Sequence, residues 1–143
     1  RNGAVTLGTL DGANVEIKEQ VGDENIITFG MTKDDVITRK SNGYVPETYF
    51  KTNNIIRAAI ERMYCGINGC AFEEVANSLR YNDPYMVLAD FDSYQQAQRY
   101  ASQCYKDAGK WNKMSLENIA GAGIFSADRA VEDYARDIWH LLR

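Results

Sequence analysis

The sequence predicts an α/β fold with two parallel strands near its N-terminal end and many helices after them. Two short apolar runs, residues 5–10 and 26–29, flank a stretch with helical character. Beyond Gly30, apolar residues recur mostly at helical spacing. The composition, with 45% hydrophobic and 25% charged residues in a chain of 143, is that of a globular domain.

Residues 5–10 are predicted to form the first strand, which ends at the turn signal Asp11-Gly12. A short helix over residues 13–20 follows and stops at Gly22, and residues 26–29 form a second, buried strand. This order is that of a βαβ unit with parallel strands. Both strands are expected to be buried on both faces, so the remaining strands must come from upstream residues or a partner chain.

The helices that follow are predicted from their caps. Thr32 caps a helix over residues 33–39, and Pro46 opens a short helix over residues 47–51. Asn53 or Asn54 caps the next helix, which ends at Gly66. Its expected apolar stripe is Ile55, Ile56, Ala59, Ile60 and Met63.

The second half of the chain predicts four more helices. The first covers residues 72–79 and ends before the breaker Asn82-Asp83-Pro84. Another follows Asp92-Ser93, where Asp92 and Gln95 resemble a capping box. A third covers residues 111–120, and Ser126 caps the last, whose stripe is Val131, Tyr134, Ala135, Ile138 and Leu142.

Charge and composition exclude several classes of partner. The net charge of −4 comes without a basic block, so we expect neither nucleic acid nor a membrane as a partner. No apolar run approaches the roughly 18 residues that cross a bilayer. Three cysteines (Cys65, Cys70 and Cys104) without CxxC spacing favour buried or incidental free thiols in a reducing cytosol.

The turn Thr9-Leu10-Asp11-Gly12-Ala13-Asn14 is the only place where the backbone pattern points to a ligand. Ligands of open α/β sheets bind beyond the carboxyl ends of strands, where helix N-termini present free N–H groups. Gly12 would allow close approach, and Asp11 or Asn14 would cap or donate. A tight turn with a helix cap explains the same residues, and the motif alone does not decide between the two.

Other candidate residues have structural explanations. His140 stands near the end of the last helix, where a polar or positive residue complements the helix dipole. A single histidine without a neighbouring ligand pattern predicts no metal site. The pair Cys65 and Cys70 could form a redox or metal site, but no second ligand pair accompanies it.

Five segments of the sequence resemble the α-glucan (glycogen, maltodextrin or starch) phosphorylase family. The most specific is NGAVTLGTLDGANVE at residues 2–16. The others are ENIITFGM at 24–31, VLADF at 87–91 with Tyr94, Trp111 with NIA at 118–120, and FSADR at 125–129. The resemblance covers essentially the whole chain and is weakest between residues 41 and 82. Ala127 departs from the second serine expected there.

The resemblance implies a GT-B architecture of two Rossmann-like domains, with residues 1–143 as the end of the second domain and its helical C-terminal extension. The final helix, about residues 126–143, is expected to cross back to the N-terminal domain. Members of the family release glucose 1-phosphate from α-1,4-glucan ends with inorganic phosphate, and the parent enzyme is expected to be a cytoplasmic homodimer.

The resemblance also implies pyridoxal phosphate, whose 5′-phosphate relays a proton to the substrate phosphate. The cofactor is held as a Schiff base on a lysine expected just upstream of Arg1. No catalytic residue, direct cofactor ligand or metal ligand is therefore expected in this chain. Thr9, Asp11, Gly12 and Asn14 are expected to form a loop behind the cofactor. The chain alone is expected to lack covalent cofactor and activity.

Three interpretations of the whole sequence remain open. The favoured one is a segment of a phosphorylase whose partner is the remainder of the polypeptide. The second is a non-catalytic module that binds glucan or scaffolds a partner. The third is an unrelated small enzyme that uses the Asp11-Gly12 turn.

Overall fold

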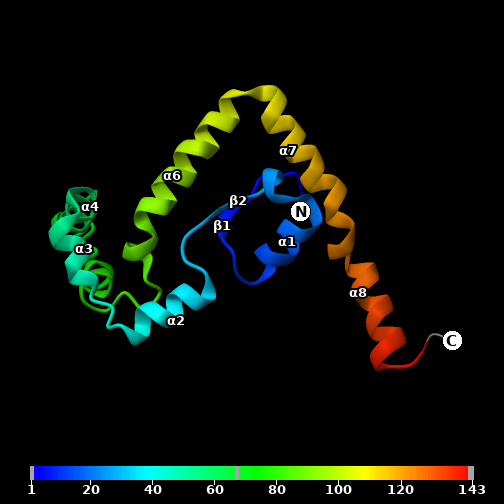
Figure 1. Ribbon diagram of the computed structural model, residues 1–143, viewed down its shortest axis with the longest axis horizontal. Coiled ribbons are helices and arrows are strands. Elements are labelled where there is room, and N and C mark those ends of the chain that lie inside the picture. Colours follow the sequence, from blue (N-terminus) through cyan, green and yellow to red (C-terminus); the bar gives the residue numbers. More distant parts are fainter. Residues whose placement is uncertain (1, 67, 142–143) are drawn as a thin grey trace. The chain divides into compact units, whose positions relative to one another are not determined.

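A computed structural model describes residues 2–66 and 68–141, which form two compact units. The first unit consists of residues 2–28 and 99–141, and the second of residues 29–98. Figure 1 shows the elements in chain order.

The first unit contains the predicted strand–helix–strand segment. Strand β1 (Leu7–Thr9) is followed by helix α1 (Ala13–Val21), a 3-10 turn η1 (Asp23–Asn25) and strand β2 (Ile27–Phe29), whose last residue is assigned to the second unit. The two strands pair as a parallel sheet (Figure 1). The predicted order of elements is confirmed.

The strands are shorter and less buried than predicted. Residues 7–9 are half-buried, Ile27 is buried and Thr28 is exposed, so burial on both faces is wrong for the described residues. The sheet they form has only two strands, and a strand pairs only as far as its partner extends. Leu10, expected at the end of β1, is therefore outside the ladder and exposed.

One helix of the first unit begins at a carboxylate cap. Asp107 accepts a hydrogen bond from the Lys110 N–H at 3.0 Å, and α7 (Ala108–Ala120) therefore starts three residues before the predicted position 111. It continues as a 3-10 segment, η3 (Gly121–Phe125), and Ser126 then precedes α8 (Ala127–Asp133). Ser126 is at the predicted N-cap position but makes no side-chain cap bond.

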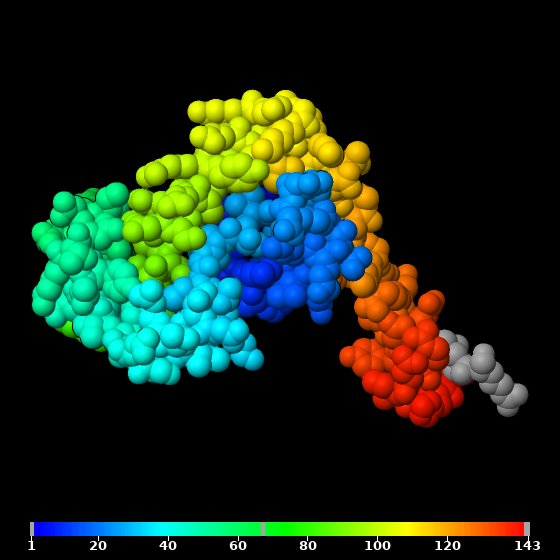
Figure 2. All heavy atoms as spheres, in the orientation of Figure 1, coloured from blue at the N-terminus to red at the C-terminus, as the bar shows by residue number. Residues whose placement is uncertain are grey.

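The last helix ends in a π-helical segment, η4 (Tyr134–Ile138). Val131, Tyr134 and Ile138 of its predicted stripe are all more than half exposed. These three residues, with the equally exposed Trp139 and Leu141, are called the α8 stripe below (orange to red in Figure 2). Leu142, the last residue predicted for the stripe, lies outside the described residues.

Two buried asparagines tie the core of the first unit together. Asn118 Nδ2 donates to the carbonyl oxygens of Asn25 (2.7 Å) and Met114 (2.9 Å). Asn25 Nδ2 donates to the Val21 carbonyl at 2.7 Å. Buried amides stabilise only when they are bonded. Here the Asn118–Asn25 bond joins α7 to the segment before β2, the Asn25–Val21 bond joins that segment to α1, and the Asn118–Met114 bond lies within α7. Val21, Ile26, Ile27, Cys104 and Met114 fill the apolar space around them.

The second unit is helical. It contains α2 (Lys33–Ser41), α3 (Pro46–Thr52), α4 (Asn54–Cys65), α5 (Glu73–Asn77), the π-helical η2 (Ser78–Asn82) and the start of α6 (Val87–Lys106). Thr32 caps α2 and Asn53 caps α4, as predicted. The helix predicted over residues 72–79 begins at Glu73 and extends through η2 to Asn82.

The core of the second unit is centred on α4. Ile56, Ile60, Ala76 and Leu88 are buried together, and Tyr49, Phe50, Met63, Tyr64, Leu79 and Phe91 pack around them. Burial of a side chain such as Ile60 contributes about 2 kcal/mol. Ile55 and Ala59 of the predicted stripe are exposed, because the contact with α5 and α6 uses a narrower face of α4 than the pattern indicated.

Helix α6 starts five residues before the predicted cap at Asp92. The Asp83 carboxylate, which is only 2% exposed, accepts hydrogen bonds from the N–H groups of Val87 and Leu88, each at 2.9 Å. Asp92 and Ser93 therefore lie inside the helix, and the predicted capping box is wrong. The predicted breaker Asn82-Asp83-Pro84 is confirmed, because η2 ends at Asn82 and α6 starts at Val87.

Candidate functional site

The turn between β1 and α1 brings together the four residues that the sequence singled out. Thr9 Oγ1 donates to Asp11 Oδ1 at 3.1 Å, and Asn14 Nδ2 donates to the Thr9 carbonyl at 2.8 Å. The Asp11 N–H donates to the same carbonyl at 3.0 Å. These bonds hold the turn at the carboxyl end of β1, where the sequence predicted it.

Gly12 leaves the start of α1 open. Its φ of +48° favours glycine, and a Cβ there would meet no atom within 4 Å. No side chain caps the helix at this position, and Asp11, Gly12 and Ala13 are exposed. An uncapped helix start is a place where backbone N–H groups attract anions.

Sequence reasoning missed the contribution of Gly8. A Cβ at Gly8 would lie 2.7 Å from Asn14 Nδ2, so a larger residue would displace the amide that braces the turn. A glycine inside a predicted strand is a signal for such a close approach. The turn therefore depends on Gly8 as well as on the four predicted residues.

The lysines of the chain do not provide a site for a Schiff base. A lysine that forms one is usually desolvated, or lies beside another cation, which lowers the pKa of its amine. Lys18 is partly exposed and lies 3.5 Å from Asp23, and the other six lysines are exposed. Hydrogen bonding to Tyr100 raises the pKa of Lys110, which disfavours the neutral amine. The six exposed lysines are Lys33, Lys40, Lys51, Lys106, Lys110 and Lys113.

The remaining candidates do not form a reactive centre. The three cysteines are free thiols, as predicted: Cys104 is buried, whereas Cys70 and Cys65, at the end of α4, are exposed and fit the incidental alternative. His140 Nδ1 lies 3.2 Å from the Arg136 carbonyl, which fits a role at the end of the last helix. Residues 2–66 and 68–141 contain no group of three or more metal-binding side chains.

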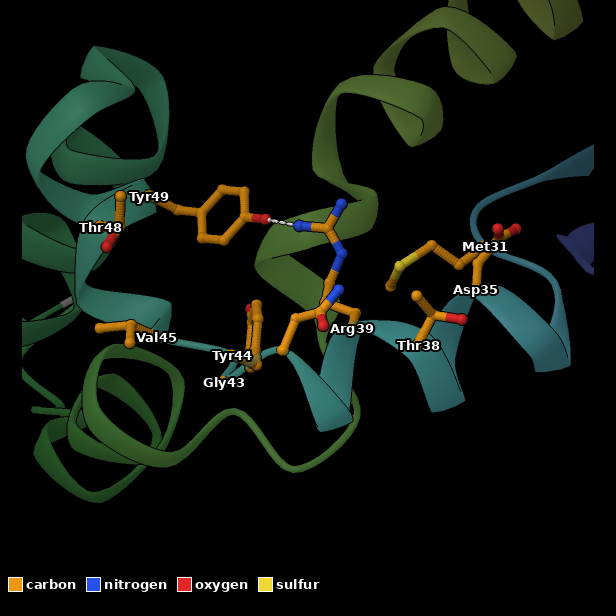
Figure 3. Close-up of a pocket in the computed structure, with 10 residues that line it drawn as sticks. Met31, Asp35, Thr38, Arg39, Gly43, Tyr44, Val45, Thr48 and Tyr49 are labelled. Carbon is orange, nitrogen blue, oxygen red and sulfur yellow. Dashed lines mark hydrogen bonds between the residues drawn. The ribbon is translucent and has the colours of Figure 1, made fainter.

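The second unit holds a cavity of about 560 Å³ that sequence reasoning did not find. Figure 3 shows Tyr49 reaching from α3 toward Arg39 on α2, whose guanidinium donates to the tyrosine hydroxyl. Tyr44, from the loop between these helices, lies beside them, and its ring centroid is 5.7 Å from that of Tyr49. Asp35 and Thr38 line the α2 side.

Two titratable groups of the cavity, the Asp35 carboxyl and the Tyr44 hydroxyl, have shifted pKa values. Hydrogen bonds from the side chain and backbone of Thr32 lower the pKa of the Asp35 carboxyl, which therefore stays ionised. Burial raises the pKa of the Tyr44 hydroxyl, and its hydrogen bond to Asp83 at 2.6 Å raises it further. Tyr44 is thus a neutral, fixed wall, while Asp35 and Arg39 supply one charge of each sign.

Comparison with known proteins gives a consistent result over the whole chain. The family model described as carbohydrate phosphorylase matches residues 1–141. The chain is 41% identical to a glycogen phosphorylase of Synechocystis over 96% of its length, and 42% identical to one of Bacillus subtilis over 96%. It is 40% identical to the ovine liver glycogen phosphorylase over 99%. The chain spans 17–18% of the length of these relatives.

None of the helices within the described ranges combines the length and the apolar character needed to cross a membrane.

Proposed function

Since this chain belongs to the carbohydrate phosphorylase family, we propose that it is part of a longer polypeptide that releases glucose 1-phosphate from α-1,4-glucan ends with inorganic phosphate. The observation that carries the proposal is the match over residues 1–141, with relatives about 40% identical along nearly the whole chain. The parent would be a glycosyltransferase. Because the chain spans about a sixth of its relatives, the rest of the polypeptide would supply the catalytic residues.

The family resemblance assigns to pyridoxal phosphate the supply of a proton to the substrate phosphate. The described residues do not offer a lysine suited to hold it, so no step is assigned through this chain. The turn of residues 9–14 would instead support neighbouring parts of the active site. Its internal hydrogen bonds fix the backbone at the carboxyl end of β1, which is what a supporting loop requires.

We also propose that residues 1–143 complete the second domain of a GT-B fold in a cytoplasmic homodimer. The two-stranded sheet supports this placement, because so small a sheet is stable only when further strands or helices cover it. The α8 stripe supports contact between the final helix and the N-terminal domain, because that contact would bury it.

The test compares the full polypeptide that contains this sequence with residues 1–143 alone. With α-1,4-glucan and inorganic phosphate, the full polypeptide should release glucose 1-phosphate and the short chain should not. After borohydride reduction, the mass of a covalently bound pyridoxyl group should appear only in the full polypeptide. Phosphorolysis or covalent cofactor in the short chain would contradict its assignment as a dependent segment.

The same experiment separates the alternative function. A full polypeptide that binds glucan but releases no glucose 1-phosphate would favour a non-catalytic glucan-binding or scaffolding module.

A further inference from the structure

The cavity between α2 and α3 has walls that are fixed before any ligand binds. Tyr44 is held through its hydroxyl by the buried Asp83. The Met31 N–H donates to Asp90 Oδ1 at 2.9 Å, which fixes the other end of the cavity. The start of α2 is closed by the reciprocal bonds between Thr32 and Asp35. A site built this way loses little conformational entropy on binding.

The charges in the cavity favour a ligand without net charge. Asp35 stays ionised, and both bonds from Thr32 use its Oδ2, which leaves Oδ1 to accept from a ligand. Arg39 donates to a neutral hydroxyl, and no carboxylate of residues 2–66 and 68–141 lies within 4.0 Å of it as an ion pair. The Asp35 carboxylate would repel a phosphate that approached Arg39. A hydroxyl group, in contrast, can donate to Asp35 or accept from Arg39.

The aromatic residues add a surface that suits a sugar ring. Tyr44 and Tyr49 lie with their rings tilted by 43° (Figure 3). A pyranose presents C–H groups on its faces and hydroxyls around its edge. It can therefore pack on a tyrosine ring while its edge reaches Asp35, Arg39 and Thr38. The volume of about 560 Å³ lies within the range of small-molecule sites, roughly 300–1,000 Å³.

We propose that this cavity is a binding site for a neutral polyhydroxyl ligand, a short α-glucan segment, separate from the turn of residues 9–14. The polyhydroxyl class rests on the cavity, and the choice of an α-glucan rests on the proposed function. Arg39 and Asp35 would bind the hydroxyl edge, and Tyr49 would carry the apolar face of one glucose unit.

The experiment uses the full polypeptide that contains this segment, with maltotetraose as the probe. Hydrogen–deuterium exchange with and without maltotetraose should show protection in residues 31–49. Arg39→Gln and Tyr49→Ala should each reduce that protection, with about tenfold weaker half-saturation, because each removes one main contact. Arg129→Gln is the matched control, since Arg129 is also an exposed, hydrogen-bonded arginine but lies on α8.

Five outcomes are informative. Protection of residues 31–49 that both variants weaken and Arg129→Gln leaves unchanged would support the site. Absence of protection in the unsubstituted protein would overturn the site, and this result does not depend on whether a variant folds. Arg39→Gln and Tyr49→Ala variants that bind maltotetraose as tightly as the unsubstituted protein would also overturn it. Protection of residues 31–49 by inorganic phosphate or glucose 1-phosphate, without maltotetraose, would overturn the proposal that the ligand is neutral. Glucose 1-phosphate release without protection of residues 31–49 would overturn this inference and leave the proposed function standing.

Discussion

Gly30, directly after β2, is a residue at which conformation and packing act together. Its φ is +83°, and a Cβ there would lie 2.6 Å from Asp90 Oδ2. Asp90 accepts from the Met31 N–H, and the Gly30 N–H donates to Ser93 Oγ at 3.0 Å. The end of β2 is therefore fixed to α6 at a point where only glycine fits.

Gly30→Ala should destabilise the protein more than Gly43→Ala. Gly43 has a similar φ of +81°, but a Cβ there meets no atom within 4 Å. Both variants carry the cost of a left-handed conformation, about 1–2 kcal/mol, and only Gly30→Ala also displaces Asp90. The free energy of unfolding in urea, measured on the full polypeptide that contains the segment, gives the comparison. Equal losses would show that Asp90 moves aside freely.

Glu47 predicts a dependence of stability on acid pH. Hydrogen bonds from Lys51 and Arg80, each at 3.1 Å, lower the pKa of its carboxyl below the ordinary 4.5. A lowered pKa in the folded state contributes stability above the unfolded value, and that contribution is lost as pH falls through the folded value. The stability difference between the parent and Glu47→Gln should therefore shrink from about pH 6 to about pH 3. A difference that stays constant with pH would contradict this.

At the scale of elements, capping residues predicted the starts of α2 and α4, because Thr32 and Asn53 bond the N–H groups two or three positions on. The start of α6 escaped prediction for a physical reason. Asp83 reaches Val87 and Leu88 across Pro84 and across Met86, which has a φ of +55°. This spacing is longer than in a capping box, so the sequence favoured Asp92 instead.

Asp83→Ala should unfold the first turn of α6, whereas Asp92→Ala should not. Asp83→Ala removes the buried carboxylate that accepts three hydrogen bonds, from the Tyr44 hydroxyl and the N–H groups of Val87 and Leu88. We expect it to lower the free energy of unfolding by about 2–3 kcal/mol. Asp92 accepts one exposed bond from Asn53 at 3.2 Å and is the matched control. Amide exchange of residues 87–90 in the full polypeptide should accelerate only in Asp83→Ala. Faster exchange in Asp92→Ala instead would restore the sequence-based cap.

At the scale of the whole molecule, the sequence predicted the order of strands and helices and the carbohydrate phosphorylase family. The turn of residues 9–14 was predicted because consecutive residues form it. The cavity was not, because Arg39, Tyr44 and Tyr49 belong to three elements and meet only after folding. Periodicity also overestimated burial on α4 and in the strands, because it cannot show how much of an apolar face is covered.

Residues 1–143 expressed alone should be aggregated, molten, or dependent on a complementary fragment or on dimer formation. The α8 stripe is exposed, with Ile138 at 59%, and the sheet has two strands. Uncovered apolar side chains, each worth roughly 1.5–3 kcal/mol when buried, and unpaired strand edges promote association. ANS fluorescence should be high and should fall in Ile138→Gln more than in Ile37→Gln, an exposed isoleucine on α2. A soluble monomer with a sharp thermal transition would contradict the dependence and favour a standalone module.

Asp83 gives the second unit a property that none of its single contacts has. One carboxylate holds both the Tyr44 hydroxyl and the first N–H groups of α6, so the two cannot be disturbed independently. Thermodynamic linkage makes that dependence reciprocal: the factor by which the held Tyr44 favours the intact helix start equals the factor by which the intact helix start favours the held Tyr44. A ligand that binds Tyr44 in its held position would therefore stabilise the start of α6, and fraying of α6 would weaken the binding of that ligand.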